Sequence, residues 1–382
     1  MPQFATNLSC TGCTACAAAC PRKCITMTAD ADGFRYPLVD ASACVECGLC
    51  TAACPVLKQT RLEHTPQAWA AYSKDGEMRM GSSSGGVFTE LSRLILAQGG
   101  AVFGAVYDEG FRVIHTAAED EAGLAKMRGA KYAQSDLDGI FADVKRRLSG
   151  GQQVLFSGTP CQVEGLISFL GKPYPNLTTV DFVCHSVPSP MVWEQYVALL
   201  SQDGPIRRID LRAKDTGWSR YQYCHRIERE RGRPRRIPNA ESLYMKLFVG
   251  DHINRLSCAQ CTFKGYARRS DLTIGDFWGI WDIAPEMDDD RGTSVVLVQS
   301  GKGRMLWEAL ESRLVRKQVS LEEASAQNGA MLRPAPAAAD RDALLARIRK
   351  GDLAGCAELF PVWRPTPVQR LKEWAARILR KR

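Results

Sequence analysis

Two short stretches near the start of the chain share one pattern of cysteines. Residues 10–21 read CTGCTACAAACP, and residues 44–55 read CVECGLCTAACP. Each stretch has three cysteines spaced by two residues, a fourth after three more residues, and then a proline. The two-residue spacers let a tight loop wrap three thiolates around one corner of an iron–sulfur cubane, while the fourth cysteine points to a second cluster. The stretches are therefore an internal repeat in which each half completes the site of the other.

This pattern, with its proline, is typical of bacterial ferredoxins and predicts two [4Fe–4S] clusters. The alternative is zinc, which uses four ligands, commonly in two separated pairs, and two matched four-cysteine runs fit that poorly. The module has few large hydrophobic residues, so we expect metal–thiolate bonds to stabilise it. The predicted ligands of one cluster are Cys10, Cys13, Cys16 and Cys54, and those of the other are Cys20, Cys44, Cys47 and Cys50.

The composition is that of an ordinary globular protein. The 382 residues carry a net charge of +8, which does not demand a nucleic-acid partner, and none is expected. No apolar run reaches the roughly 18–20 residues of a membrane span, and the first residues lack the features of a signal peptide. We therefore expect a cytoplasmic protein with no transmembrane segment. Fifteen cysteines in such a chain favour metal binding over disulfides.

Beyond residue 67 the pattern alternates between strands and helices. The alternation predicts a mixed α/β fold, in which a small dicluster ferredoxin-like domain is fused to a larger mixed α/β domain, and the family resemblance described below implies that this larger domain is of a flavin-binding type. We place the domains at residues 1–62, 67–330 and 331–382, the last as a helical, basic extension. Strands are expected at 68–72, 101–107, 112–116, 154–156, 178–183 and 293–298, and helices at 84–98, 136–148, 162–170, 191–200 and 303–314.

Residues 81–86, GSSSGG, lie directly before an expected helix. Free N–H groups at a helix start, exposed by small residues, form an anion site, although a plain N-cap in a close-packed loop explains the same residues. The chain has no GxGxxG fingerprint and no GxxxxGK[ST] loop, which disfavours a Rossmann NAD enzyme and a P-loop NTPase.

Four further cysteines lie in settings that suit metal binding. Thr159 and Pro160 fit the N-cap and first position of a helix, which places Cys161 in the first turn, where the helix dipole favours thiolate. A Cys-x2-Cys pair at Cys258 and Cys261 has Cys184 upstream. Together the four would hold a third [4Fe–4S] cluster. Zinc in the same thiolates, a redox-active Cys161, or a buried structural cysteine are the alternatives.

Several motifs in the second half of the chain carry a resemblance to a known family. The chain resembles the coenzyme F420 hydrogenase/dehydrogenase β-subunit family, in the form that has a fused N-terminal dicluster ferredoxin. The motifs read SSGG at residues 83–86, RGAKY at 128–132, GTPCQVEGL at 158–166, DFVCHSVPSP at 181–190, CAQCTFK at 258–264 and SDLTIGDFWG at 270–279.

The resemblance implies an oxidoreductase that contains FAD and an iron–sulfur cluster of its own. In the family the flavin exchanges hydride with a deazaflavin, coenzyme F420, and clusters carry single electrons onward. We therefore expect a redox partner protein or a small redox carrier. The alternative is an electron-relay subunit with neither flavin nor substrate site. The expected flavin-binding residues are Ser83, Ser84, Gly85, Gly86 and Lys131, with Thr159 and Asp276 lining the same pocket through the family motif.

Two basic segments remain. Residues 226–236 hold six arginines and two glutamates without aromatic residues between them, and we expect a solvated hairpin or loop. Residues 368–382 have apolar residues at helical spacing with basic residues between them. Packing on the core is the first interpretation of this C-terminal helix, and peripheral contact with a membrane surface is the second.

Overall fold

The computed structural model describes residues 4–59 and 62–361. Residues 4–59 form a small module, in which strands β1 (Ile25–Ala29) and β2 (Arg35–Val39) pair antiparallel beside helices α1 (Ala15–Ala19) and α2 (Leu49–Ala52). Thr14 and Gly48, which precede the two helices, have φ of 65° and 72°. They occupy equivalent positions in the cysteine repeat. The left-handed residue lets each loop turn tightly around its first three cysteines.

A mixed sheet forms the centre of the larger domain. Within the described residues it has eight strands in the order β13-β3-β12-β11-β7-β6-β4-β5. Strands β4, β6, β7 and β11 run parallel to their neighbours in that series, and the remaining pairs are antiparallel. The bounds are β3 (Gln67–Ser73), β4 (Ala101–Tyr107), β5 (Val113–Ala118), β6 (Val154–Gly158), β7 (Leu177–Phe182), β11 (Leu272–Asp276), β12 (Ser294–Val298) and β13 (Leu314–Val319).

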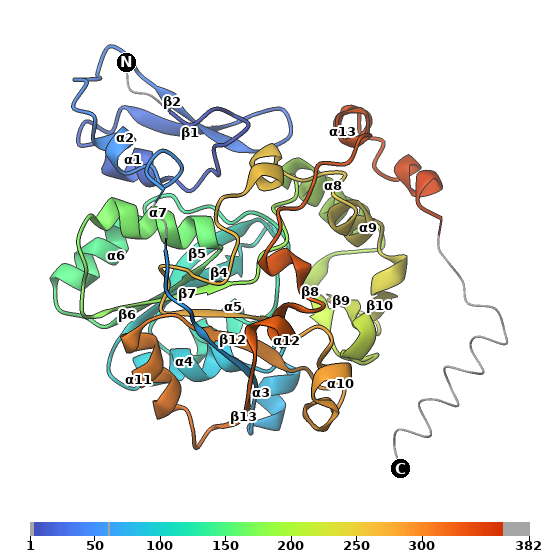
Figure 1. The fold of residues 1–382 in the computed structure, drawn as a ribbon. Coiled ribbons are helices and arrows are strands. Elements are labelled where there is room, and N and C mark those ends of the chain that lie inside the picture. Colours follow the sequence, from blue (N-terminus) through green and yellow to red (C-terminus); the bar gives the residue numbers. More distant parts are fainter. Residues whose placement is uncertain (1–3, 60–61, 362–382) are drawn as a thin grey trace.

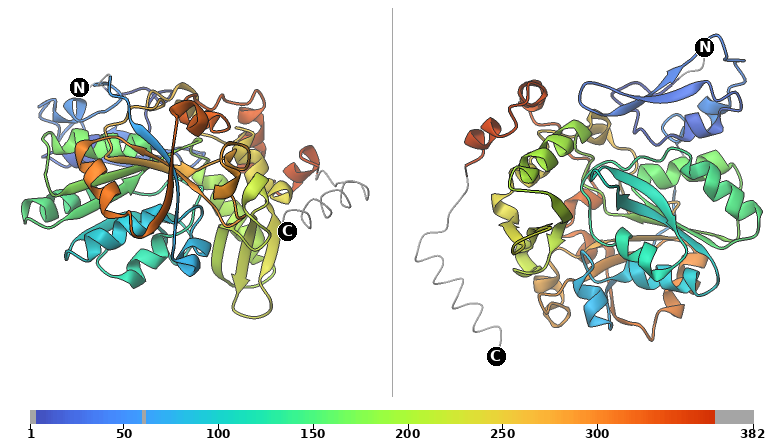
Figure 2. Two further views of the ribbon diagram at one scale, coloured as in Figure 1. Left: turned by 60° about the horizontal axis from the view of Figure 1, so that its bottom comes forward. Right: turned by 180° about the vertical axis from the view of Figure 1, so that it is seen from behind.

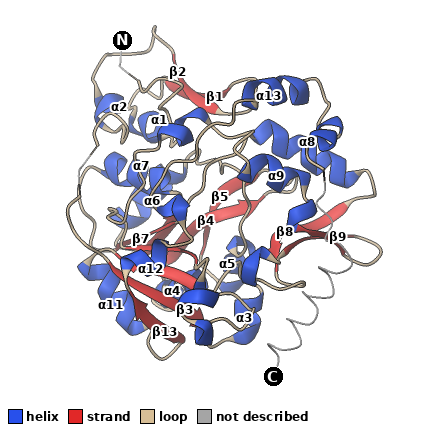
Figure 3. Cartoon of the chain, turned by 45° about the vertical axis from the view of Figure 1, so that its right-hand side comes forward, coloured by secondary structure: helices blue, strands red, loops and turns tan. Residues whose placement is uncertain are grey.

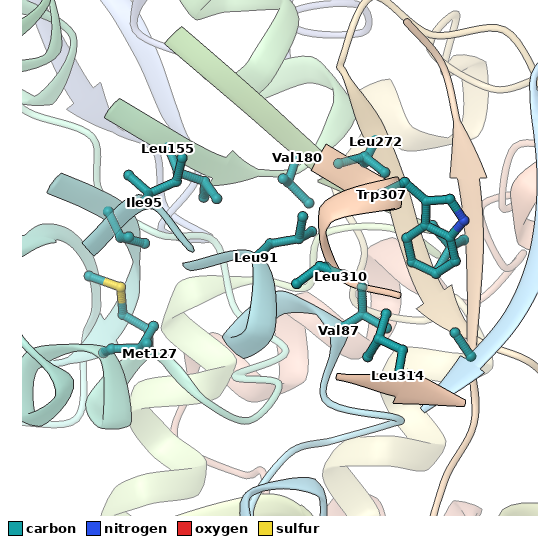
Figure 4. Close-up of a cluster of buried hydrophobic side chains, with 14 of the residues drawn as sticks. Val87, Leu91, Ile95, Met127, Leu155, Val180, Leu272, Trp307, Leu310 and Leu314 are labelled. Atoms are coloured by element: carbon teal, nitrogen blue, oxygen red, sulfur yellow. The ribbon is translucent and has the colours of Figure 1, made fainter. Parts of the chain in front are cut away.

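Helices cover both faces of this sheet (Figures 1 and 2). Helices α4 (Val87–Leu96), α5 (Glu121–Met127) and α11 (Gly301–Ala309) pack on one face, where Leu91, Trp307 and their neighbours form a buried cluster (Figure 4). Helices α6 (Ile140–Ser149) and α7 (Pro160–Leu170) pack on the other face. Successive side chains along each strand point to opposite faces of the sheet, so each strand contributes to the packing on both faces.

The module lies against the α6–α7 face of the larger domain. Helix α1 contacts both α7 and α6, and Cys13, Ala15 and Ala53 share one hydrophobic cluster with residues of those helices. Figure 1 shows the module, in dark blue, above α7. The first cysteine run therefore faces the core, and of the second run the end near Ala53 also packs there, while Cys47 is exposed.

A second, smaller sheet lies at the side of the large one (Figure 3). In the described part of the chain it comprises strands β8 (Ile206–Ala213), β9 (Cys224–Arg229) and β10 (Arg235–Pro238). It packs with α8 (Pro190–Ser201), α9 (Leu243–Val249) and α13 (Arg341–Arg349). The remaining elements are α3 (Gly76–Met80), α10 (Ile280–Ile283), α12 (Leu321–Ser325) and the 3₁₀ turns η1 (Ser219–Tyr221), η2 (Asn239–Glu241), η3 (Leu256–Gln260), η4 (Pro285–Met287), η5 (Gly329–Met331) and η6 (Gly355–Leu359).

The mixed α/β fold expected from the sequence is confirmed, with shifts at some helix ends. The helix expected at 84–98 begins at Val87, because a Cβ on Gly85 would lie 2.3 Å from the Ala71 carbonyl oxygen and Gly86 has φ of 86°. The helix expected at 303–314 ends at Ala309, and Leu314 begins strand β13. Residues 226–236 form the β9–β10 hairpin. The helix predicted at 368–382 lies outside the described residues.

The domain boundaries stay a prediction. Helix α13, which falls in the predicted extension, packs with α8 and α9 in the cluster around the smaller sheet. None of the helices within residues 4–59 and 62–361 has the length and apolar character that a membrane crossing requires.

Candidate functional site

The cysteines of the module form two groups, each drawn from both runs. In the first group, burial raises the pKa of Cys16 to about 12, and the nearby thiols of Cys10 and Cys54 raise it as well. Burial also raises the pKa of Cys13, with Cys16 and Cys10 among its neighbours. The structure therefore places Cys54, from the second run, beside the first three cysteines.

The second group lines a cavity at the outer end of the module. Cys44, Cys47 and Cys50 contribute from the second run, and Cys20 contributes from the first. The sequence did not single out Cys24 as part of this site, but its thiol lines the same cavity and lies 3.3 Å from Cys20 Sγ. Cys47 is exposed, so this group lies at the surface.

A third group of four cysteines lines a cavity in the larger domain. Cys161 follows β6 in the first turn of α7, with Thr159 as N-cap and Pro160 as the first helical residue. Cys184 lies just beyond β7, while Cys258 lies in η3 and Cys261 ends that turn. All four line one cavity. The site thus lies at the carboxyl ends of adjacent parallel strands, where open α/β sheets bind their ligands.

The thiols of this group do not have the lowered pKa that the helix start at Cys161 suggested. Burial raises the pKa of Cys161 to about 11 and that of Cys258 to about 12, and it raises that of Cys184 as well. Thr159 Oγ1, 3.1 Å from Cys161 Sγ, acts against this shift. Desolvation outweighs the helix dipole here, because burial in a low-dielectric cavity disfavours the charged thiolate. A nearby cation is needed to stabilise that charge. A metal centre that displaces the thiol protons supplies that cation.

The walls of the core cavity offer hydrogen-bond donors to a bound anionic group, which fits an iron–sulfur cluster. The hydroxyl oxygens of Ser186 and Ser257 are buried there without a hydrogen-bond partner in the described part of the chain. Such orphaned donors call for an acceptor in the cavity.

The first module group lies between the other two. Cys13 packs directly on α7, since a Cβ added to Gly165 would lie 3.0 Å from both Cβ and Sγ of Cys13. Cys161, in the same helix, is close enough to Cys13 to influence its pKa. Thr11, from the first cysteine loop, lines the core cavity. The three groups therefore form a series from the sheet edge, through the first run, to the exposed second run.

The serine–glycine loop before α4 lies at the same edge of the sheet. Ser84 Oγ donates to the Thr293 carbonyl oxygen at 2.8 Å, and the Gly85 N–H donates to Ser294 Oγ at 3.0 Å. Ser83 Oγ accepts from the Ala130 N–H at 2.7 Å. These bonds hold the loop against the start of β12 and against the RGAKY motif.

Lys131 is buried and already has partners. Its Nζ donates to the carbonyl oxygens of Lys126, Met127, Arg128 and Gly129 at 2.9–3.2 Å, at the carboxyl end of α5. Burial lowers the pKa of Lys131 to about 7. A flavin phosphate would have to draw the ammonium away from these carbonyls, so phosphate binding by Lys131 stays a prediction.

Arg212, which the sequence did not single out, joins several of the predicted flavin residues. Its guanidinium forms a two-pronged ion pair with Asp276 at 2.9 Å and donates to Tyr132 Oη at 2.8 Å. It also lies 3.5 Å from the Ser83 carbonyl oxygen, and Trp278 stacks on it. Thr159, by contrast, lies at the core thiol cavity. No local pattern marks Arg212, because its partners come from distant parts of the sequence.

Comparison with known proteins identifies two regions of the chain. Residues 151–323 match the family model described as the C terminus of the coenzyme F420 hydrogenase/dehydrogenase beta subunit, and residues 9–57 match a 4Fe–4S dicluster domain. The module therefore holds two [4Fe–4S] clusters. No curated protein matches the chain.

Among solved structures, the chain is similar to a chain of the F420-reducing [NiFe] hydrogenase complex from Methanosarcina barkeri, in a xenon derivative. The identity is 17%, the TM-score is 0.47, and the match covers 78% of this chain and 92% of that chain.

Proposed function

We propose that this chain, which belongs to the coenzyme F420 hydrogenase/dehydrogenase β-subunit family, is an iron–sulfur flavoprotein oxidoreductase. It passes electrons between a two-electron carrier or substrate, through a flavin, and the [4Fe–4S] clusters of its ferredoxin-like module. The observation that carries the proposal is the series of three thiol groups, which runs from the carboxyl edge of the large sheet to the exposed loop at Cys47.

The three groups supply three cluster sites in this proposal. The four thiols of the core cavity take the third cluster, and the hydroxyls of Ser186 and Ser257 donate to its sulfur atoms. The cluster beside Cys13 is the middle station, and the one beside Cys47 meets the redox partner. The assigned ligands are Cys161, Cys184, Cys258 and Cys261 for the core cluster, Cys10, Cys13, Cys16 and Cys54 for the middle cluster, and Cys20, Cys44, Cys47 and Cys50 for the outer cluster.

The flavin, proposed as FAD, is assigned to the sheet edge between the serine–glycine loop and Asp276. A bound flavin accepts a hydride and releases two single electrons, which the clusters alone do not do. Arg212 bonds to Asp276 and Tyr132 there, and the loop of Ser83 and Ser84, which is bonded to Ala130 and Thr293, is the proposed site of the flavin phosphates. A deazaflavin of the F420 type is the proposed two-electron partner, because the matching family is described by that coenzyme.

The test of the clusters is a count of iron in the full-length protein, reconstituted anaerobically. We expect about twelve iron atoms per chain, four for each cubane. The variant Cys258→Ser should lower the count by about four. Cys356→Ser is the matched control, because Cys356 is buried in the hydrophobic cluster around α13 and lies outside all three thiol groups. Iron near eight in the wild type would contradict the core cluster.

The test of the flavin is the visible spectrum and the flavin content of the same preparation. We expect about one flavin per chain, and a structured absorption band that clusters alone lack. Lys131→Ala should lower flavin retention while the iron count stays unchanged. A wild-type protein with full iron and no flavin after reconstitution with FAD would instead favour the electron-relay subunit. Unchanged flavin content in Lys131→Ala would remove Lys131 from the site.

A further inference from the structure

A buried arginine lies where the module meets the core. Only 1% of the surface of Arg255 is exposed. The residue precedes η3, the turn that carries Cys258, and its carbonyl oxygen accepts from the Cys258 N–H at 3.0 Å. Its side chain lines the cavity of the four core thiols. Arg255 is therefore part of the wall of the core cluster site.

The guanidinium of Arg255 reaches out of the core and into the module. Nε donates to the Cys10 carbonyl oxygen at 2.8 Å, and Nη2 donates to the Arg35 carbonyl oxygen at 2.9 Å. Nη1 donates to Gln134 Oε1 at 3.2 Å, and Gln134 in turn donates to the Thr11 carbonyl oxygen at 3.0 Å. The rest of its surroundings are aromatic, with the ring of Tyr36 4.3 Å away. One side chain thus touches the backbone of the Cys10 loop and the core cavity together.

The charge of Arg255 has no carboxylate partner. Among the described residues, no Asp or Glu forms an ion pair with it, and all of its hydrogen bonds run to neutral oxygens. A buried charge without a counter-charge is costly unless something anionic lies nearby. The other buried arginines near the site differ, because Arg212 pairs with Asp276 and Arg268 lies 3.7 Å from Asp181. The cysteines of the cavity that Arg255 lines, and of the Cys10 loop that it contacts, are able to balance its charge once they bind metal as thiolates.

We infer that Arg255 is the shared counter-charge of the core cluster and of the cluster beside Cys10, and that it raises the reduction potentials of both. The inference rests on the proposed function, because it requires a cluster at the core thiols. A fixed positive charge favours the reduced state of a neighbouring cluster, which carries one more negative charge. A low-dielectric site strengthens the effect, and the absence of a carboxylate leaves the charge uncancelled. The charge of Arg255 thus makes the inner two clusters better electron acceptors than they would be without it.

The experiment is a redox titration of the full-length reconstituted protein, followed by electron paramagnetic resonance. The resonance signal of the core cluster is identified as the one that is lost in Cys258→Ser. The midpoint potential of the outer cluster, at Cys20, Cys44, Cys47 and Cys50, serves as the internal reference. Arg255→Met removes the charge and keeps much of the side-chain volume. At the wild-type midpoint potential of the core cluster, we expect its ratio of reduced to oxidised form to fall at least tenfold in this variant. That change corresponds to a midpoint about 59 mV lower for one electron.

Two further variants separate charge from structure. Gln134→Leu removes the neutral side chain that accepts from Arg255 Nη1. At the wild-type midpoint potentials, we expect the ratio of reduced to oxidised cluster to change less than twofold in this variant. Arg255→Lys keeps the charge and loses the fork of hydrogen bonds. At the wild-type midpoint potential, its ratio of reduced to oxidised cluster should stay within threefold of the wild-type ratio. If Arg255→Met fails to hold its clusters, the Arg255→Lys midpoint decides the question, and a tenfold change there overturns the inference.

The outcomes also separate this inference from the proposed function. Unchanged midpoints in Arg255→Met with full iron, or an equal shift in Gln134→Leu, would overturn the role of the charge and leave the three-cluster proposal standing. Wild-type iron near eight would instead refute the core cluster. In that event the midpoint of the cluster beside Cys10, titrated in the same variants, decides whether the charge of Arg255 acts on its neighbour.

Discussion

The module and the larger domain are stabilised by different means. The buried apolar residues of the module are mostly cysteines and alanines, with Ile25 and Phe34 as its larger members. The larger domain buries leucines, valines, phenylalanines and tryptophans on both faces of its sheet, as at Leu91 and Trp307 (Figure 4). A short chain with so little apolar side-chain volume cannot offset its conformational entropy by packing alone. We therefore expect metal binding and folding to be one process in the module and separate processes in the core.

The largest expected effect comes from removing iron and sulfide from the whole protein. Amides of β1 and β2 should then exchange hydrogen at the rate of an unstructured chain, because the thiolate–metal bonds no longer hold the loops. Amides of β6 and β7 should stay protected, because their core is apolar. Hydrogen-exchange mass spectrometry of the holo and apo forms measures both regions in one sample. Equal protection of β1 and β2 in the two forms would show that the module folds without its clusters.

The second expected effect is confined to the core. Leu91 is 1% exposed and lies in the buried cluster between α4 and the sheet. Leu91→Ala should lower the free energy of unfolding of the larger domain by about 2–5 kcal/mol, the usual range for a buried leucine. Urea unfolding followed by circular dichroism measures this change, and iron content in the absence of urea should equal that of the wild type.

The control for this variant is Met305→Ala on α11, where the side chain is 69% exposed. It should change the free energy of unfolding by less than about 0.5 kcal/mol. Loss of iron from Leu91→Ala before urea is added would show that the core and the module are coupled more tightly than the comparison implies.

The same comparison explains which features the sequence could predict. The two thiol groups of the module follow from local spacing, since the loops that carry them are short and repeat one backbone pattern at Thr14 and Gly48. The sequence indicates the four core cysteines because each lies in a motif of the family that the chain resembles, and their role as cluster ligands stays a prediction. The buried strands β4, β6 and β7 have apolar runs that mark them clearly.

Other features depend on contacts that no local pattern contains. Arg255 acquires its role from the way the Cys10 loop packs on the core, and Arg212 from the meeting of Asp276 with Tyr132. The sequence pattern did not mark β8 as a strand, because the pairing of β8 with β9 shifts register twice. Such shifts interrupt the alternation of apolar and polar residues that is typical of a strand. Lys131 was expected to face a ligand, but its four carbonyl partners belong to the end of α5, which the sequence pattern did not define.

The smallest expected effect tests the contact between the two regions. Gly165 lies inside α7, where Gly→Ala normally stabilises a helix by about 1 kcal/mol. Here the new Cβ would lie 3.0 Å from Cβ and Sγ of Cys13, so the cysteine has to shift by a few tenths of an ångström. Gly301→Ala is the control for an open position, because Gly301 is the first residue of α11 and nothing lies within 4 Å of a Cβ there. We expect Gly301→Ala to raise the midpoint of urea unfolding, and Gly165→Ala to lose that gain and to alter the resonance signal of the cluster beside Cys13. If both variants gain equally and the signal is unchanged, Cys13 is not packed against α7, and the two regions are more independent than the structure indicates.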